Sequence, residues 1–207
     1  MRFAALSLLA TIASAAFAYA APSSPATNAV EARGYGGYGG CGCSDIQGII
    51  GGATAALTPV LAQLTYITSE NCTAEALTPV VAEIKDILTV TIAEVQGLVG
   101  IALIIVLTTV DGVLLTVADV AGLVCGLLNL ICGALLIVLK VVATVELVVV
   151  KGLLVEILKL VAQLLFCLFP LIDGLLAAIL VIVGGVVIEV IQLLSLTSVF
   201  YCFKTLY

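Results

Sequence analysis

Seven cysteines are the side chains of this sequence with the most obvious chemistry. In an oxidising compartment they predict disulfides, and six of them could pair and leave one thiol for a bond between molecules. Cys125 and Cys132 lie about 10 Å apart along one predicted helix, too far to bond each other there. We therefore expect each to reach another element. The disulfide candidates are Cys41, Cys43, Cys72, Cys125, Cys132, Cys167 and Cys202.

The C-x-C pair of Cys41 and Cys43 has two interpretations, a disulfide tether and a metal or redox element. The sequence contains no histidine and no second close cysteine pair, so the tether is the better interpretation. The cysteines also lack the adjacent Cys-Cys doublets of fungal hydrophobins, which excludes that class.

A second group of reactive side chains consists of four acids in apolar surroundings, Asp111, Asp119, Asp173 and Glu189. Burial there would raise their pKa values and make a functional role conceivable. No acid or base stands beside them at a revealing spacing, and helix caps or turns explain the three aspartates better. The sequence also lacks a nucleophile elbow, a phosphate loop and a metal motif. It predicts no enzyme, no cofactor and no metal site.

Composition limits the remaining functions. Of the 207 residues, 63% are hydrophobic and 10% are charged, against about 45–50% and about 25% in ordinary globular chains. A soluble monomer of this size has too little interior to hide that much apolar surface, so some of it should face lipid, another copy or an interface. The net charge is −6 without a basic cluster, which excludes nucleic-acid binding.

The N-terminal part reads as a leader followed by a tail. Residues 1–20 predict a secretory signal peptide cleaved after Ala20, with an uncleaved anchor helix as the alternative. Residues 21–43 predict a flexible pro-segment and a Gly/Tyr-rich tail. A processing protease could cut after Arg33, although a plain linker is an equal interpretation.

Residues 44–96 predict an amphipathic helical region. Ser44-Asp45 can cap a helix that starts near Ile46. The motif ALTPV occurs at residues 56–60 and 76–80, and its Thr-Pro pair predicts a helix start, or a kink in the first copy. Between the copies, Asn71-Cys72-Thr73 matches the N-glycosylation pattern, so Asn71 is a candidate glycosylation site.

Residues 97–207 are the strongly hydrophobic region. Together with the end of the preceding region, they predict long, very hydrophobic helices over roughly 78–109, 112–138, 140–168 and 172–195. The segment Val120–Leu139 has no charge and is long enough to span a bilayer. The spacing of Gly122, Gly126 and Gly133 would let two helices pack closely. The polar residues of 140–168 favour a helix with one wet face.

The fold class predicted is all-α, a bundle of about four to five long helices after a disordered tail. The high Val and Ile content leaves a β-sheet alternative. The apolar runs exceed ordinary strand lengths and lack regular turns, and this favours helices.

The layout resembles small secreted non-hydrophobin structural proteins of mushroom-forming fungi, which are associated with the cell wall and aerial hyphae. The matching features are the leader ending Ala18-Tyr19-Ala20, the Cys-containing tail, the ALTPV helix with Glu83-Ile84-Lys85-Asp86, and the apolar C-terminal half. The resemblance implies a surface-active protein that coats hyphae, lowers wettability and helps attachment.

Three functional hypotheses follow. The first is a secreted structural protein that self-associates or adsorbs at the cell wall and the air–water interface. The second is a membrane protein with about four spans, of which Val120–Leu139 is the clearest and Gly174–Ile188 a shorter candidate; Lys151, Glu156 and Lys159 argue against a span between them. The third is a small lipid-binding carrier, in which a helical bundle holds its ligand.

Overall fold

The structure is a computed structural model that describes residues 45–142, 146–196 and 198–200. These residues form seven helices and one isolated β-bridge, between Thr108 and Leu114. The all-α fold class is thus confirmed for the described part of the chain. The helices are α1 (Ile46–Leu64), α2 (Ala74–Gln96), α3 (Leu103–Leu107), α4 (Val117–Val141), α5 (Leu147–Leu168), α6 (Leu175–Ile182) and α7 (Gly185–Leu193).

Several sequence-based predictions lie outside the described residues and stay predictions. They are the signal peptide with cleavage after Ala20, the processing site at Arg33, the Gly/Tyr-rich tail, and the cysteines Cys41, Cys43 and Cys202.

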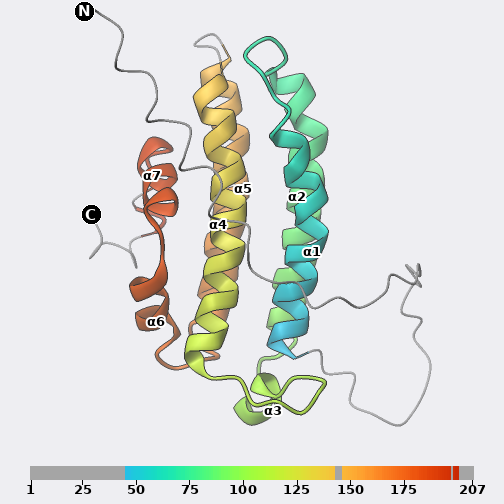
Figure 1. Ribbon diagram of the computed structural model, residues 1–207, viewed down its shortest axis with the longest axis vertical. Coiled ribbons are helices and arrows are strands. Elements are labelled where there is room, and N and C mark those ends of the chain that lie inside the picture. The colour runs from blue at the N-terminus through green and yellow to red at the C-terminus, as the bar shows by residue number, and fades with distance from the viewer. Residues whose placement is uncertain (1–44, 143–145, 197, 201–207) are drawn as a thin grey trace, which may run out of the picture. The chain divides into compact units, whose positions relative to one another are not determined.

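Four long helices, α1, α2, α4 and α5, run side by side as a bundle in which the chain alternates direction (Figure 1). α1 packs on α2 and on α4, and α5 packs closely on α2 and more loosely on α4. The short helices α6 and α7 lie on the side of α4 away from α1 (Figure 1). α4 therefore contacts four other helices, which makes it the central element of the fold.

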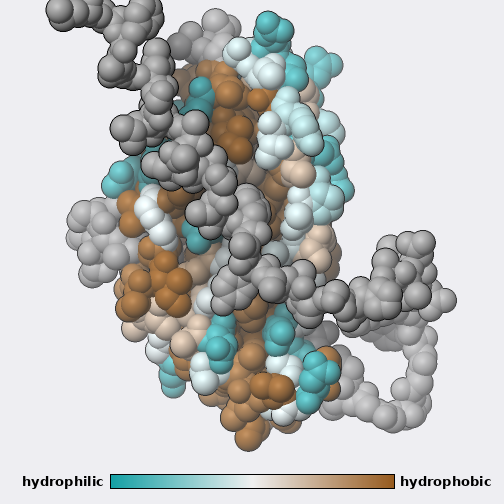
Figure 2. Space-filling view, viewed as in Figure 1, coloured by the Kyte–Doolittle hydropathy of each residue, from teal (hydrophilic) through white to brown (hydrophobic). Residues whose placement is uncertain are grey.

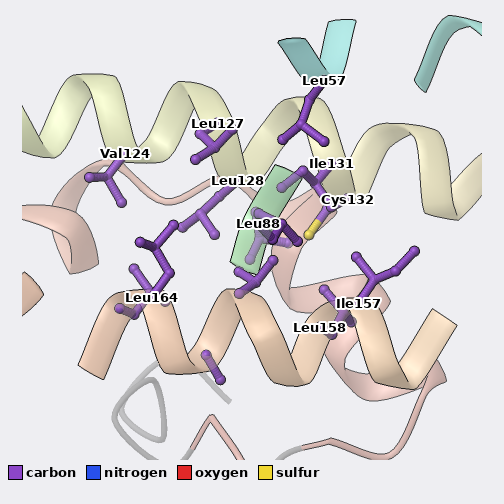
Figure 3. Close-up of a cluster of buried hydrophobic side chains, with 14 of the residues drawn as sticks. Leu57, Leu88, Val124, Leu127, Leu128, Ile131, Cys132, Ile157, Leu158 and Leu164 are labelled. Atoms are coloured by element: carbon purple, nitrogen blue, oxygen red, sulfur yellow. The ribbon is translucent and has the colours of Figure 1, made fainter. Parts of the chain in front are cut away.

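The central position of α4 explains its uncharged sequence. A helix that is apolar nearly all round is buried either in protein or in lipid, and here other helices cover much of α4. Its side chains meet Leu57 of α1, Leu88 of α2 and Leu164 of α5 in one core (Figure 3). Val120–Leu139 is thus the core helix of this bundle.

Both ends of α4 are specified by local polar groups. At the start, Thr116 and Asp119 form a capping box: the Thr116 hydroxyl accepts from the Asp119 amide at 3.2 Å, and the Asp119 carboxylate accepts from the Thr116 amide at 2.8 Å. Lys140 lies in the last turn, where a positive charge favours the helix dipole. Lys140 therefore belongs to α4 and does not open the next helix, which begins at Leu147.

Both ALTPV copies lie inside helices, so neither marks a helix start. For the first copy this agrees with the alternative prediction of a helix already running, and for the second copy the prediction is wrong. Asp45 caps α1 and Thr73 caps α2; both lie upstream of the prolines, Pro59 and Pro79. A proline inside a helix lacks the N–H that would bond the carbonyl four residues earlier. The similarity extends to ALTPVLAQL and ALTPVVAEI, with the Leu and Val of each motif buried.

Two predicted helices are shorter than the apolar pattern implied. The predicted helix 78–109 ends at Gln96, and Gly100 then adopts a φ of +89°, a conformation that glycine reaches without strain. The predicted helix 172–195 is broken between α6 and α7, which meet at 95°. The break leaves Gly184 next to α4, with the Asn129 side-chain oxygen 3.4 Å from where a Cβ on Gly184 would lie.

Candidate interfacial surface

Those predicted reactive groups that lie in the described part of the chain do not come together into a site. The described residues contain no group of three or more His, Cys, Asp or Glu that could hold a metal ion. Asp119 is a capping residue, and hydrogen bonds from the Thr116 hydroxyl and amide lower its pKa. This direction is opposite to the rise expected for an acid in apolar surroundings. Asp111 and Asp173 lie in exposed turns, and Glu189 is exposed on α7.

The described cysteines behave as small apolar side chains. Burial raises the pKa of Cys125 to about 11 and that of Cys132 to about 12, so both are protonated thiols at neutral pH and poor nucleophiles. Burial, and then the negative charge of Glu146, raises the pKa of Cys72. Cys132 points into the core (Figure 3). The Cys125 thiol lies 3.9 Å from the Ile179 carbonyl of α6.

None of the four described cysteines, which include Cys167 on α5, is bonded to another of the four. The Cys167 sulfur lies 3.7 Å from the side-chain nitrogen of Gln96. Disulfides that involve Cys41, Cys43 or Cys202 remain predictions.

Asn71 lies exposed in the loop between α1 and α2. Its side-chain oxygen accepts from the Thr68 amide at 2.7 Å. The hydroxyl of Thr73, the third residue of the pattern, accepts from the Ala76 amide as the cap of α2. Glycosylation of Asn71 stays a prediction, on a loop that is open to solvent.

No described helix packs closely against α4 at Gly122, Gly126 or Gly133, so the close packing of two helices there stays a prediction. Gly122 and Gly126 are exposed and Gly133 is half-buried. A Cβ built on any of the three would meet nothing within 4 Å beyond its own surroundings in the helix. The reason is that α4 packs through its larger side chains, such as Leu128 and Ile131, and the glycines lie on another face.

The most distinctive surface of the described chain is the connection between α2 and α4. We call residues 98–115 the apolar end; they comprise α3 and the two segments joined by the bridge of Thr108 and Leu114. It lies at the end of the bundle where α1 and α4 begin and α2 ends (Figure 1). Seven large aliphatic side chains in or beside it are between 44% and 90% exposed: Val99, Leu103, Ile104, Ile105, Val110, Val113 and Leu114.

This exposure is concentrated enough to be informative. Single exposed aliphatic residues are ordinary in soluble proteins, whereas a contiguous patch marks an interaction surface. Figure 2 shows the hydrophobic surface at the end of the bundle that carries α3. The loop at the other end, residues 65–73, is mainly polar, and hydrophilic surface gathers there in the same view.

The backbone of the apolar end is bonded largely to itself. The Thr109 amide donates to the Val113 carbonyl at 2.8 Å, and the Leu115 amide donates to the Leu107 carbonyl at 2.9 Å. These bonds close a short hairpin whose turn contains Gly112, with a φ of +78°. Further amides donate to carbonyls of the same segment: Ile101, Ile105, Val106, Thr108 and Gly112.

Asp45 connects this hairpin to the bundle. It is 5% exposed, and its two carboxylate oxygens have separate partners. One accepts from the Gly48 amide at 2.7 Å and so caps α1. The other accepts from the Val110 amide at 3.1 Å, across 65 positions of sequence. Asp45 therefore positions Val110, the most exposed aliphatic residue of the hairpin.

Among the described residues, the charges around the apolar end are all negative. Segments 45–50, 94–119 and 169–174 contain five acids and no Lys or Arg: Asp45, Glu94, Asp111, Asp119 and Asp173. The four described lysines lie toward the middle or the other end of the bundle, at positions 85, 140, 151 and 159. One of them, Lys85 of α2, pairs with Glu156 of α5 at 2.5 Å. This ion pair lowers the pKa of Glu156.

The apolar end was not predicted, because the apolar pattern of residues 78–109 indicates one continuous helix. The signal that could have located it is the spacing of Gly97, Gly100 and Gly112, which divide an apolar run into pieces too short for a long helix. Such pieces cannot present one continuous buried face, so part of their apolar surface stays outside.

In the described residues, α4 is the one unbroken helix with the length and hydropathy to cross a membrane. Other parts of the protein bury 56% of its most apolar stretch. α6 and α7 meet the same criteria jointly, but the 95° bend interrupts the predicted span Gly174–Ile188.

The comparisons with known proteins give no assignment: the chain matches no protein-family model, no curated protein sequence and no solved structure.

Proposed function

We propose that the chain is a secreted, surface-active structural protein that self-associates or adsorbs at the cell wall and at hydrophobic interfaces. The observation that carries this proposal is the cluster of exposed aliphatic side chains at the apolar end. Burial of such side chains gains free energy in proportion to the area removed from water, about 25 cal/mol per Å². A bundle whose exposed aliphatic side chains are concentrated at one end is an amphiphile, which adsorbs in a preferred orientation.

The apolar interior offers a second stage of adsorption. α6 and α7 are short, meet at a sharp bend and expose Val181, Ile182 and Leu193. They pack on α4, and no disulfide among the described cysteines ties them to the bundle. Displacement of this pair would open the core of α4 to an interface or to another copy.

The proposal is tested by the surface tension of solutions of the purified protein, measured on a pendant drop. The double variant Val110→Ser with Ile104→Ser removes two exposed aliphatic side chains from the apolar end. The matched control, Val148→Ser with Val90→Ser, removes two exposed valines elsewhere. We expect wild type and control to lower the tension at similar rates and the first variant to act more slowly. A wild type that leaves the tension at the buffer value would overturn the proposal.

A membrane protein is the second candidate, and the observation in its favour is that α4 could cross a bilayer by length and composition. The sequence suggested about four spans. The charged residues Lys151, Glu156 and Lys159 of α5 argue against a span there, and the bend between α6 and α7 argues against a straight span in that region. Resistance of the membrane-bound protein to alkaline carbonate would favour this candidate.

A further inference from the structure

We propose that the apolar end docks on an electrically neutral lipid surface, and that the acids around it exclude it from anionic lipid. This inference rests on the proposed function and names the surface that the apolar end takes. Three observations carry it: the exposed aliphatic side chains, the internal hydrogen bonds of the segment and the sign of the charges around it.

The internal hydrogen bonds of the hairpin favour its entry into lipid. A backbone amide without a partner costs several kcal/mol in hydrocarbon, so irregular segments are normally kept out of it. In the hairpin, the amides of Thr109 and Leu115 donate to carbonyls across the bridge, and the Val113 amide donates to the Thr109 hydroxyl at 3.1 Å. The Thr108 hydroxyl donates to the Ile104 carbonyl at 2.5 Å. These groups of the hairpin therefore need no water, whereas the uncapped start of α3, with the amides of Leu103 and Ile104, does not share these bonds.

The hairpin is a poor edge for a peptide partner that would add a strand, because it is held by a single isolated bridge and presents only a short row of main-chain groups. Such recognition uses free main-chain donors and acceptors at a sheet edge. Here the Val110 amide, at the tip, already donates to Asp45. The outward surface of the apolar end is mainly aliphatic. Asp111 is the one charged side chain in the described segment 98–115.

The charges decide between lipid and a second copy. A two-fold contact places the same patch on both molecules, so two apolar ends would bring Glu94, Asp111, Asp119 and Asp173 of one copy toward those of the other. These four acids are exposed, and their repulsion opposes that contact. An uncharged lipid surface carries no such penalty, whereas an anionic surface repels them.

The experiment measures flotation of the full secreted protein with vesicles. Vesicles of phosphatidylcholine are compared with vesicles in which part of that lipid is replaced by phosphatidylserine. We expect wild type to float with the first, to bind the second more weakly at low salt, and to regain binding as salt screens the repulsion. Val110→Ser with Ile104→Ser should lower binding to phosphatidylcholine by about tenfold, and Val148→Ser with Val90→Ser should leave it near wild type.

A charge-matched pair of variants tests the role of the acids. Asp111→Asn with Glu94→Gln removes two charges at the apolar end, and Asp86→Asn with Glu83→Gln removes two from exposed positions inside α2. We expect the first pair to raise binding to phosphatidylserine vesicles by about fivefold per charge, and the second to have a much smaller effect. Equal gains would show that net charge, and not the acids at this end, controls binding.

The outcomes separate the inference from the proposed function. If wild type lowers surface tension but floats with neither vesicle, or binds phosphatidylserine as well as phosphatidylcholine, the lipid inference is wrong and the surface-active function stands. If wild type neither lowers surface tension nor floats, both are wrong. If wild type floats with phosphatidylcholine but the serine variant at the apolar end floats equally well, another surface binds the lipid, and the inference is again wrong.

Discussion

At the scale of single residues, Asp45 has two structural roles that can be separated by mutation. Its carboxylate caps α1 through Gly48 and holds the hairpin through Val110. Replacement of an N-cap aspartate by alanine costs about 0.5–2 kcal/mol, so we expect Asp45→Ala to lower the free energy of unfolding by about that amount or more. Denaturant unfolding followed by circular dichroism measures the change.

The control for Asp45→Ala is Asp86→Ala, which removes an exposed acid in the middle of α2. We expect it to change stability by less than about 0.5 kcal/mol. Equal losses in the two variants would contradict the role assigned to Asp45.

The capping box of α4 gives a pH dependence with a definite sign. Hydrogen bonds from Thr116 lower the pKa of Asp119 in the folded state, so the unfolded chain binds more protons at mildly acidic pH. The contribution of Asp119 is present above its ordinary pKa of 3.8 and is lost as the pH falls through the lowered value. We expect the loss of stability from about pH 6 to about pH 3 to be smaller in Asp119→Asn than in wild type. Urea unfolding at both pH values measures it, and an unchanged loss would show that the box does not respond to charge.

At the scale of elements, α4 is the core of the bundle, and its mutations should act on stability. Leu128 is 2% exposed on α4, whereas Leu114 in the apolar end is 57% exposed. Replacement of a buried leucine by alanine costs about 2–5 kcal/mol. We therefore expect Leu128→Ala to lower the free energy of unfolding by about that amount, and Leu114→Ala to change it by about 0.5 kcal/mol or less. Similar losses at the two positions, measured by denaturant unfolding, would contradict the burial assigned to α4.

What the sequence could predict also depends on the element. The periodicity of residues 84–95 and the caps around α4 specify helices locally, because the required contacts lie within a few residues. The partners of α4 are set by contacts over long sequence separations, such as Cys125 with Ile179. The sequence alone could therefore not tell whether Val120–Leu139 faces lipid, an interface or other helices.

The same limit applies to the candidate surface. The prediction of exposed apolar surface followed from composition, but its location followed from where the helices end. The turns at Gly100 and Gly112 fold the apolar end back on itself, and Asp45 fixes it from 65 residues away. Neither the exposure of Val110 nor this long-range bond has a local signature.

At the scale of the whole molecule, an apolar bundle carries a concentrated cluster of exposed aliphatic side chains at one end. Secretion and surface activity are predicted together, since a leader that is cleaved after Ala20 would release the bundle outside the cell. The alternative, in which α4 is a transmembrane segment, requires the part of α4 that the other helices leave uncovered to face lipid.

The most direct test of this account is fractionation of an expressing culture, with the membrane pellet washed in alkaline carbonate. We predict that the protein lies in the medium or the wall, lacks residues 1–20 and is absent from carbonate-resistant membrane. Protein that stays in the washed pellet until detergent is added would contradict the account and make α4 a membrane-spanning helix.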